Sequence, residues 1–594
     1  MKHSLLRVAA LLSPVLGAAC ASSTQSAPPN APAPSASPSA AAEALPMQLP
    51  PRPTSVAISE RDLMTRLYAF ADDSMLGREA GTLGNYKATE YLAAEARRLG
   101  LEPAGENGTY FQTVPLKTRG VNADATLGFD GGALALGTDM AALTYTELPG
   151  APTGSRIVGS NIPVIYGGTV GAVAITADQA RGKLVVLAPV NGPTGAPIGL
   201  FWTQAPVLDP DYTALAGAAG IAVAVLDLLP SNFIAPLTGS ATTLQTTPDA
   251  TPAGTGPMAL LVTRAAASRL LGTDLGAAAP GLAGRTVNAD VRIESSDPVR
   301  PARNVVAVLR GRDPVLRNQY VAVGAHSDHV GMDPQPVDHD SLRAFNSVYR
   351  PRGADNPNPL PPTPERTAEF RRMLDSMRAL RPARMDSIFN GADDDGSGSM
   401  AVLEIAEALA GSPEKPRRSV LFVWHTAEEK GLYGAAWYAG NASVPRDSIV
   451  TMLNIDMIGR GGAGDLEGGG PGYVQLIGSR RLSSELGALV ETINTRGNYG
   501  LRFDYQYDAA GHPSQFYCRS DHYEYAKFGI PVTFFSTGGH RDYHQLTDEP
   551  QYIDYAQLHR ITRFINGVLV EVANADRAPR VDQARPDPEA QCVQ

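Results

Sequence analysis

The chain has 594 residues, of which 43% are hydrophobic and 19% are charged. This is the composition of a globular protein that is too long for one hydrophobic core, so two or three folded units are expected. A net charge of −10 at pH 7, with nothing resembling a basic stripe, argues against nucleic acid as a partner. Three cysteines, Cys20, Cys518 and Cys592, are too few for a disulfide framework.

Residues 1–20 read "MKHSLLRVAALLSPVLGAAC", with basic, apolar and then small residues. This pattern predicts an export signal and is too short for a membrane-spanning helix. The end of the segment resembles a bacterial lipoprotein box, although Gly17 stands three residues before Cys20, where that pattern usually has Leu. We therefore expect a periplasmic or extracellular protein, anchored to a membrane only if Cys20 is lipidated. The Pro/Ala/Ser-rich segment 21–57 is expected to be a tether.

The composition and sequence pattern of the rest of the chain change twice. Residues 58–118 begin with apolar residues at helical spacing, and residues 119–297 are rich in Gly, Ala, Thr and Val with short strand-like runs. Residues 298–576 alternate apolar runs with helical patterns and are followed by a tail, 577–594. The alternation predicts an α/β fold with a mixed β-sheet flanked by helices, built from 58–118 and 298–576, into which a mostly β domain is inserted.

Ionisable side chains follow several of the apolar runs. Open α/β sheets build their sites at the carboxyl ends of their strands, so these side chains are expected to converge. Each motif alone is more often a solvated turn or surface, but as a set they would leave several charges unpaired beside buried strands. The residues concerned are His326, Asp328, the aspartates of "GADDDG", the adjacent Glu428 and Glu429, Asp456 and His544.

A metal would supply the missing charge. Two histidines and several carboxylates without cysteine suit catalytic zinc, or less well manganese or cobalt. The ligands are too many for one ion with an open position, which favours two ions that share a carboxylate at a spacing of roughly 3.5–4 Å. Such a pair lowers the pKa of a bridging water and polarises a carbonyl. A remaining carboxylate then takes the proton and passes it to the leaving amine.

The ordered motifs "HSD", "GADDDGSG", "AEEKGLYG", "NIDMIG", "SDHYEYAKFGIPV" and "DYH" resemble the M28 family of zinc exopeptidases, of the bacterial leucyl aminopeptidase type. Within residues 119–297, "ARGKLVVLAPV" and "ALAGAAGIAVAVLDL" are similar to a protease-associated (PA) domain. The resemblance implies a zinc aminopeptidase-like fold, two Zn²⁺ per chain and a peptide substrate.

The resemblance also implies roles for single residues. One zinc would be held by His326, Asp394 and Asp456, with Asp394 bridging, and the other by Glu429 and His544. Glu428 would be the general base, Asp328 would orient His326, and Tyr517 would help to hold the developing oxyanion. The family places its bridging carboxylate on a strained turn, so the peptide bond between Asp394 and Asp395 is expected to be cis.

One departure concerns the 394 − 326 = 68 residues between His326 and Asp394, which the family usually joins by a short loop. The extra segment, about 331–390, is either a surface ornament or a lid or oligomer contact. His329 and His339 lie near the site in sequence, but nothing gives them a ligand role. If Cys20 is lipidated, an oxidising compartment would allow Cys518 and Cys592 to pair.

Three alternatives to an aminopeptidase stay open. A glutamate carboxypeptidase-like enzyme would need arginines at the site, for which Arg460, Arg519 and Arg541 are candidates. A single-zinc glutaminyl cyclase is disfavoured because the two-metal ligand set is complete. A receptor-like binding protein is disfavoured because no ligand is lost. The sequence leaves the preferred substrate residue and the oligomeric state open.

Overall fold

The computed structural model describes residues 45–144, 154–189, 214–229, 238–239, 241–245, 256–356, 358–590 and 592–594. The predicted export signal, Cys20 and most of the predicted tether lie outside these residues. The described chain forms two compact units, which are a smaller unit, Lys117–Asp297, and a larger unit, Ala44–Leu116 with Pro298–Gln594. Among the described helices, none is long and apolar enough to span a membrane.

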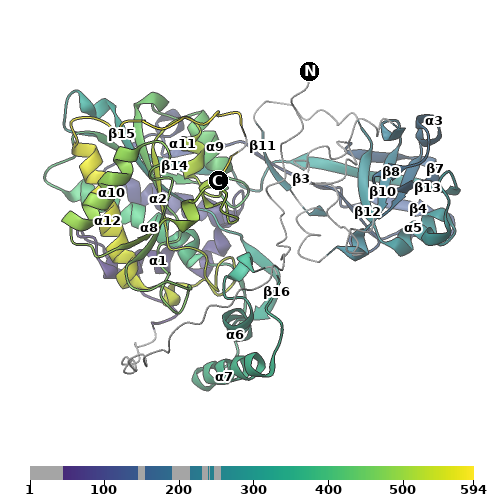
Figure 1. The fold of residues 1–594 in the computed structure, drawn as a ribbon, viewed down its shortest axis with the longest axis horizontal. Coiled ribbons are helices and arrows are strands. Elements are labelled where there is room, and N and C mark those ends of the chain that lie inside the picture. The colour runs from purple at the N-terminus through teal and green to yellow at the C-terminus, as the bar shows by residue number, and fades with distance from the viewer. Residues whose placement is uncertain are drawn as a thin grey trace, which may run out of the picture. The chain divides into compact units, whose positions relative to one another are not determined.

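The larger unit is built on a nine-stranded mixed sheet (Figure 1). Its centre consists of parallel neighbours in the order β18 (Ser419–His425), β15 (Tyr320–His326), β19 (Ile449–Ile455) and β22 (Val532–Ser536). All residues of β15 and β18 are buried, as expected for parallel strands covered on both faces. The outer strands are β14 (Ala302–Leu309), β1 (Glu102–Pro103), β2 (Phe111–Val114), β20 (Tyr473–Ile477) and β21 (Arg502–Asp504).

Helices cover both faces of this sheet. Alternate residues of β14 face opposite cores, since Val305 and Ala307 join one apolar cluster while Val306 and Val308 join the other, which is the two-residue period of a strand. The first cluster is covered by α1 (Glu60–Phe70), α2 (Leu83–Arg98), α8 (Gly398–Gly411), α10 (Ser484–Arg496) and α12 (Tyr555–Asn574). The second is covered by α9 (Tyr433–Gly440) and α11 (His522–Ala526). The predicted fold class, a mixed sheet flanked by helices, is confirmed.

Helix α12 shows how the sequence sets these elements. The Asp554 side chain accepts a hydrogen bond from the backbone amide of Gln557 and so caps the first turn, a preferred role for Asp. Leu558, Ile561 and Ile565 then bury one face of the helix at the spacing of an amphipathic helix.

The smaller unit is mostly β-structure. Its eleven-stranded sheet runs in the order β11-β3-β13-β7-β9-β10-β12-β6, with β4, β5 and β8 paired off this path. That it is a PA domain stays a prediction. Its strands are β3 (Leu116–Val121), β4 (Thr126–Phe129), β5 (Gly132–Leu134), β6 (Met140–Ala142), β7 (Arg156–Thr169), β8 (Ala172–Val173), β9 (Leu184–Ala188), β10 (Gly220–Ala224), β11 (Ala241–Leu244), β12 (Met258–Val262) and β13 (Ala283–Ser296), and its helices include α3 (Ala177–Ala180) and α5 (Arg264–Leu271).

The extra segment 331–390 folds as a small substructure of the larger unit, which we call the insertion. Strands β16 (Met332–Asp338) and β17 (Met385–Ile388) pair antiparallel at its base. Between them lie α6 (His339–Tyr349), the short turn η8 (Gly353–Asp355) and α7 (Pro364–Leu380). Every residue of α7 is at least partly exposed, so α7 forms the outer side of the insertion.

A disulfide joins the C-terminal tail to the larger unit. Cys518 and Cys592 are bonded, with their α-carbons 5.7 Å apart. The side-chain amide oxygen of Gln594 also accepts a hydrogen bond from the backbone amide of Tyr517 at 2.9 Å. The predicted pairing of the two cysteines is therefore confirmed.

Candidate metal centre

The central parallel strands bring the predicted metal ligands to one edge of the sheet. His326 is the last residue of β15, Asp456 directly follows β19, and Glu429 follows β18. His544 lies in the segment after β22, and Asp394 lies on the turn Ala392–Ser397 that leads into α8. The carboxyl edge of an open α/β sheet is where such folds place their sites.

The side chains form two groups that share Asp394. His326 Nε2 lies 3.1 Å from Asp394 Oδ1 and 3.7 Å from Asp456 Oδ1. His544 Nε2 lies 2.9 Å from Asp394 Oδ2 and 2.9 Å from Glu429 Oε2. The two oxygens of Asp394 therefore face different histidines, which is the arrangement of a bridging carboxylate.

The three carboxylates of the turn Ala392–Ser397 make different contacts. Asp393 accepts the backbone amide of Gly459 at 2.6 Å, while Asp394 points to the histidines. Asp395 ties three segments together by accepting the backbone amides of His326, Gly398 and Met457. The peptide bond between Asp394 and Asp395 is cis, as predicted.

The turn after β18 separates the two adjacent glutamates. It begins at Ala427, whose φ is 57°. Glu428 then reaches the first group, with Oε2 4.0 Å from His326 Nε2. Glu429 turns to the second group and contacts His544. The two carboxylates thus serve different groups, although they are neighbours in sequence.

Asp328 links the two loops that carry the first group. Its backbone carbonyl lies 3.1 Å from His326 Nδ1, and its carboxylate lies 3.8 Å from the same atom. Asp328 Oδ1 also accepts the backbone amide of Glu428 at 3.1 Å. Contacts to both residues place Asp328 where it can fix the His326 ring beside Glu428, which is the role the resemblance implies.

The electrostatics of the groups fit a divalent cation. Burial raises the pKa of Glu428 well above its ordinary value, and Glu429 and Asp456 add to this effect. Against the effect of burial, His326 and His544 hold the pKa of Asp394 well below its ordinary value. Asp394 Oδ2 is buried, and His544 is close to it without the geometry of a hydrogen bond, a state that is costly unless a cation is present. Imidazoles and carboxylates without a thiolate form a donor set that suits catalytic zinc.

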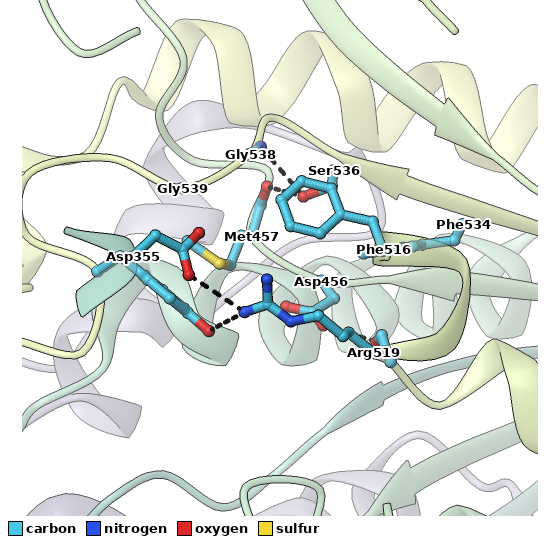
Figure 2. A pocket seen from close by; sticks show the side chains of 11 residues that line it. Asp355, Asp456, Met457, Phe516, Arg519, Phe534, Ser536, Gly538 and Gly539 are labelled. Carbon is cyan, nitrogen blue, oxygen red and sulfur yellow. Dashed lines mark hydrogen bonds and ion pairs between the residues drawn. The ribbon is translucent and has the colours of Figure 1, made fainter. Parts of the chain in front are cut away.

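A narrow cavity of about 50 Å³ opens beside Asp456 (Figure 2). Figure 2 shows the Arg519 guanidinium directed toward Asp355, and the two groups are 3.4 Å apart. Asp355 belongs to η8, so the insertion supplies part of the cavity wall. The other lining residues are Met457, Phe516, Ser520, Phe534, Ser536, Gly538, Gly539 and Tyr543.

His329, for which the sequence indicates no ligand role, and Tyr543, which the sequence did not single out, also lie at the site. His329 Nδ1 lies in hydrogen-bond contact with Glu429 Oε1 at 2.7 Å, so it helps to fix that carboxylate. Tyr543 lines the cavity and stacks on His544, with ring centroids 4.1 Å apart. The available signal for both was adjacency in sequence to a predicted site residue, in "HSDH" and in "DYH".

Tyr517 lies apart from these groups. It is only 6% exposed and packs against Arg481, His522 and Tyr523, and it is not among the residues that line the cavity. Its role as an oxyanion donor stays a prediction.

Paired substitutions of the two tyrosines will separate their roles. The Tyr543 hydroxyl accepts a hydrogen bond from Arg519 at 3.3 Å, which leaves its own proton free for a substrate oxygen. Tyr543→Phe is therefore expected to lower kcat/KM by about 10²-fold, whereas Tyr517→Phe should leave it nearly unchanged. Steady-state kinetics on both variants check this. A large loss in Tyr517→Phe with normal activity in Tyr543→Phe would instead support Tyr517 as the oxyanion donor.

Comparison with known proteins finds one peptidase family and several aminopeptidases. Residues 304–569 match peptidase family M28. An aminopeptidase from Pseudomonas aeruginosa is 42% identical over 95 residues, which are 16% of this chain and 17% of the relative. Leucine aminopeptidase 1 from Ajellomyces capsulatus is 27% identical over 210 residues, 34% of this chain and 51% of the relative. These matches thus span between about a sixth and a half of the relatives' lengths.

Among solved structures, a zinc aminopeptidase from Bacillus subtilis aligns with 90% of this chain and 100% of its own. The TM-score is 0.45 and the sequence identity is 15%. The family match spans four of the strands whose carboxyl ends carry the site and covers all of the predicted ligands. The part of this chain that is similar to peptidase family M28 is thus the part that carries the candidate metal centre.

Proposed function

We propose that this protein is an exported two-zinc aminopeptidase that removes residues from the N-terminus of peptides. The observation that carries the proposal is the division of Asp394, whose two oxygens face His326 on one side and His544 on the other. Each histidine has a further carboxylate beside it, Asp456 and Glu429 respectively. The five side chains would hold two ions, and Glu428 is left over for proton transfer.

The chain's own residues supply the rest of the chemistry. Zinc, when bound, polarises the scissile carbonyl and lowers the pKa of the attacking water. Glu428 takes the proton from that water and gives it to the leaving amine. Burial raises the pKa of this carboxylate, and a higher pKa makes it a better proton acceptor. Asp328 holds His326 and Glu428 in position beside each other. Tyr543 donates a hydrogen bond from its hydroxyl group to the developing oxyanion.

The charges around the cavity favour an aminopeptidase over a carboxypeptidase. A C-terminal carboxylate would need free arginines, but Arg519 is already paired with Asp355. Arg460 is buried and paired with Asp465 and Asp542. The cavity walls include Met457, Phe516 and Phe534, so an apolar N-terminal side chain fits best. The presence of both ligand groups also disfavours a single-zinc cyclase and a non-catalytic receptor.

The test is a panel of aminoacyl amides, free peptides and N-terminally blocked peptides, assayed with the chelated protein and after zinc is added back. We expect zinc-dependent cleavage only where the amino group is free, and fastest where the first residue is apolar. Cleavage of blocked peptides from their C-terminus would show a carboxypeptidase. An inactive protein with full zinc content would show a binding protein.

The pair formed by Arg519 and Asp355 is expected to set the charge preference of the cavity. Asp355→Asn removes the partner of Arg519 and leaves a positive charge in the wall. Relative to a leucine substrate, kcat/KM for a substrate with an N-terminal glutamate should rise about tenfold, because a charged hydrogen bond becomes available. Asp375→Asn changes an exposed carboxylate of the same insertion and serves as the control. An unchanged ratio in Asp355→Asn would remove the pair from the specificity site.

Export is proposed from the N-terminal pattern and is supported by the disulfide, since such bonds persist in oxidising compartments. Lipidation of Cys20 would anchor the protein through the tether. Cys20→Ala is then expected to move the protein from the membrane fraction to the soluble fraction. Identical fractionation of the two proteins would contradict the anchor.

A further inference from the structure

A second cluster of histidine and carboxylate side chains lies where the base of the insertion meets the larger unit. His339 begins α6, Asp386 lies on β17, and Glu549 precedes the short turn Pro550–Tyr552. One possible ligand atom of each residue lies within 4.8 Å of those of the other two. The three residues are 0%, 8% and 4% exposed, so the cluster is buried.

His339 has the surroundings of a metal-binding histidine. Its Nδ1 is hydrogen-bonded to Asp340 Oδ1 at 3.3 Å, and Asp340 is held in turn by Arg381 at 2.8 Å. Metal-bound histidines characteristically donate their second ring N–H to such a carboxylate, which leaves the other nitrogen as the ligand. That other nitrogen, Nε2, lies 2.9 Å from Glu549 Oε2 but has no hydrogen-bond partner within the described chain.

Asp386 offers a second unsatisfied atom. Its Oδ1 accepts the backbone amide of Ile388 at 3.1 Å, while its Oδ2 is buried and has no hydrogen-bond partner among the residues described. An Arg384 guanidinium nitrogen lies 3.5 Å from this Oδ2, outside hydrogen-bond geometry, and Arg384 is also paired with Glu549. Burial raises the pKa of Asp386 above its ordinary value. A buried carboxylate oxygen in this state is costly unless a cation approaches it.

The cluster also has a route to solvent. Arg384 and Glu549 line a cavity of about 740 Å³ whose wall includes Asp72, Asp73 and Gln48. An entry path and at least three ligands of suitable type are what a bound ion requires.

We propose that His339, Asp386 and Glu549 bind a divalent cation, Zn²⁺ or Mn²⁺, which fastens the insertion to the larger unit. One imidazole and two carboxylates suit these ions. The ion would bring two positive charges to a cluster that otherwise contains two carboxylates, Asp386 and Glu549, and the Arg384 guanidinium. The site is separate from the one formed by His326, Asp394, Asp456, Glu429 and His544, and the proposal does not depend on the reaction catalysed there.

The direct test is metal counting on the full-length protein. Wild type, His339→Gln and Asp386→Asn are saturated with Zn²⁺, desalted and analysed by mass spectrometry for zinc and by amino-acid analysis for protein. Each variant is expected to hold one ion per chain fewer than wild type, and the exposed control Asp375→Asn should keep the full number. Equal numbers in all four proteins would overturn the proposal and leave His339 in direct contact with Glu549.

The loss of one ion from the His339 variant should also appear when the site around Asp394 is disrupted. The same difference of one ion is therefore expected between Asp394→Asn and the double variant Asp394→Asn/His339→Gln. If both single substitutions prevented folding, the wild-type protein would still give an answer through proteolysis of the insertion. Chelation should speed tryptic cleavage in α7, which contains Arg371 and Arg372, and Zn²⁺ or Mn²⁺ should slow it again. Cleavage at the same rate with and without the metal would overturn the proposal.

Discussion

Replacing Glu428 by glutamine is expected to lower kcat by about 10²–10⁴-fold, the usual contribution of a general base. The substitution keeps the shape of the side chain and removes its ability to accept a proton. Glu428 Oε2 lies 4.0 Å from His326 Nε2, whereas the ligand pairs lie closer. The zinc content of the variant should therefore equal that of wild type.

The measurement is steady-state kinetics beside metal analysis on the same preparation. Glu414→Gln is a matched control, because this side chain is 74% exposed and lies in an ion pair with Arg312. Loss of zinc from Glu428→Gln would make this residue a ligand and not the base. Full activity would show that the proposed active site is wrong.

Replacing Glu429 by glutamine is expected to act on the metal instead of on the proton transfer. Glu429 contacts His544 at 2.9 Å and His329 at 2.7 Å, and these contacts hold its pKa below the ordinary value although burial acts in the opposite direction. The anionic carboxylate is therefore ready to bind an ion. Zinc content should fall by about one ion per chain relative to wild type, and added zinc should restore part of the activity.

The two glutamate variants have opposite signatures, so they test each other. If Glu429→Gln kept the wild-type number of ions while Glu428→Gln lost one, the two assignments would have to be exchanged. If neither variant lost zinc, Glu429 would not be a ligand, and His329 would be the next candidate for the second group because it also approaches Asp394, at 3.8 Å.

The sequence predicts the sheet and its edge because both depend on local periodicity. Short apolar runs that alternate with helical patterns indicate α/β layers, and residues that directly follow such runs, including His326 and Asp456, must lie at the ends of the strands. The sequence also predicts the aspartate turn, because glycines flank the three aspartates. These predictions need no knowledge of how distant loops fold back.

The features of the cavity that the sequence does not predict depend on contacts between loops that are far apart in the chain. Asp355 and Arg519 are 164 residues apart and meet across the cavity, which no local pattern encodes. In the short turn Phe516–Cys518, Phe516 lines the cavity while Tyr517 is buried against Arg481. A difference of one position in such a turn decides which ring meets the substrate, and the sequence alone does not fix it.

The disulfide between Cys518 and Cys592 connects residues 592–594 to a segment that forms part of the cavity wall. Cys518 lies between Phe516 and Arg519, both of which line the cavity, and the tail is attached to this same segment through Gln594. A newly made chain in a reducing compartment lacks the covalent attachment, and its wall is then held by hydrogen bonds and packing alone. The segment that carries Phe516 and Arg519 is thus attached covalently to residues 592–594 only while the two cysteines are oxidised.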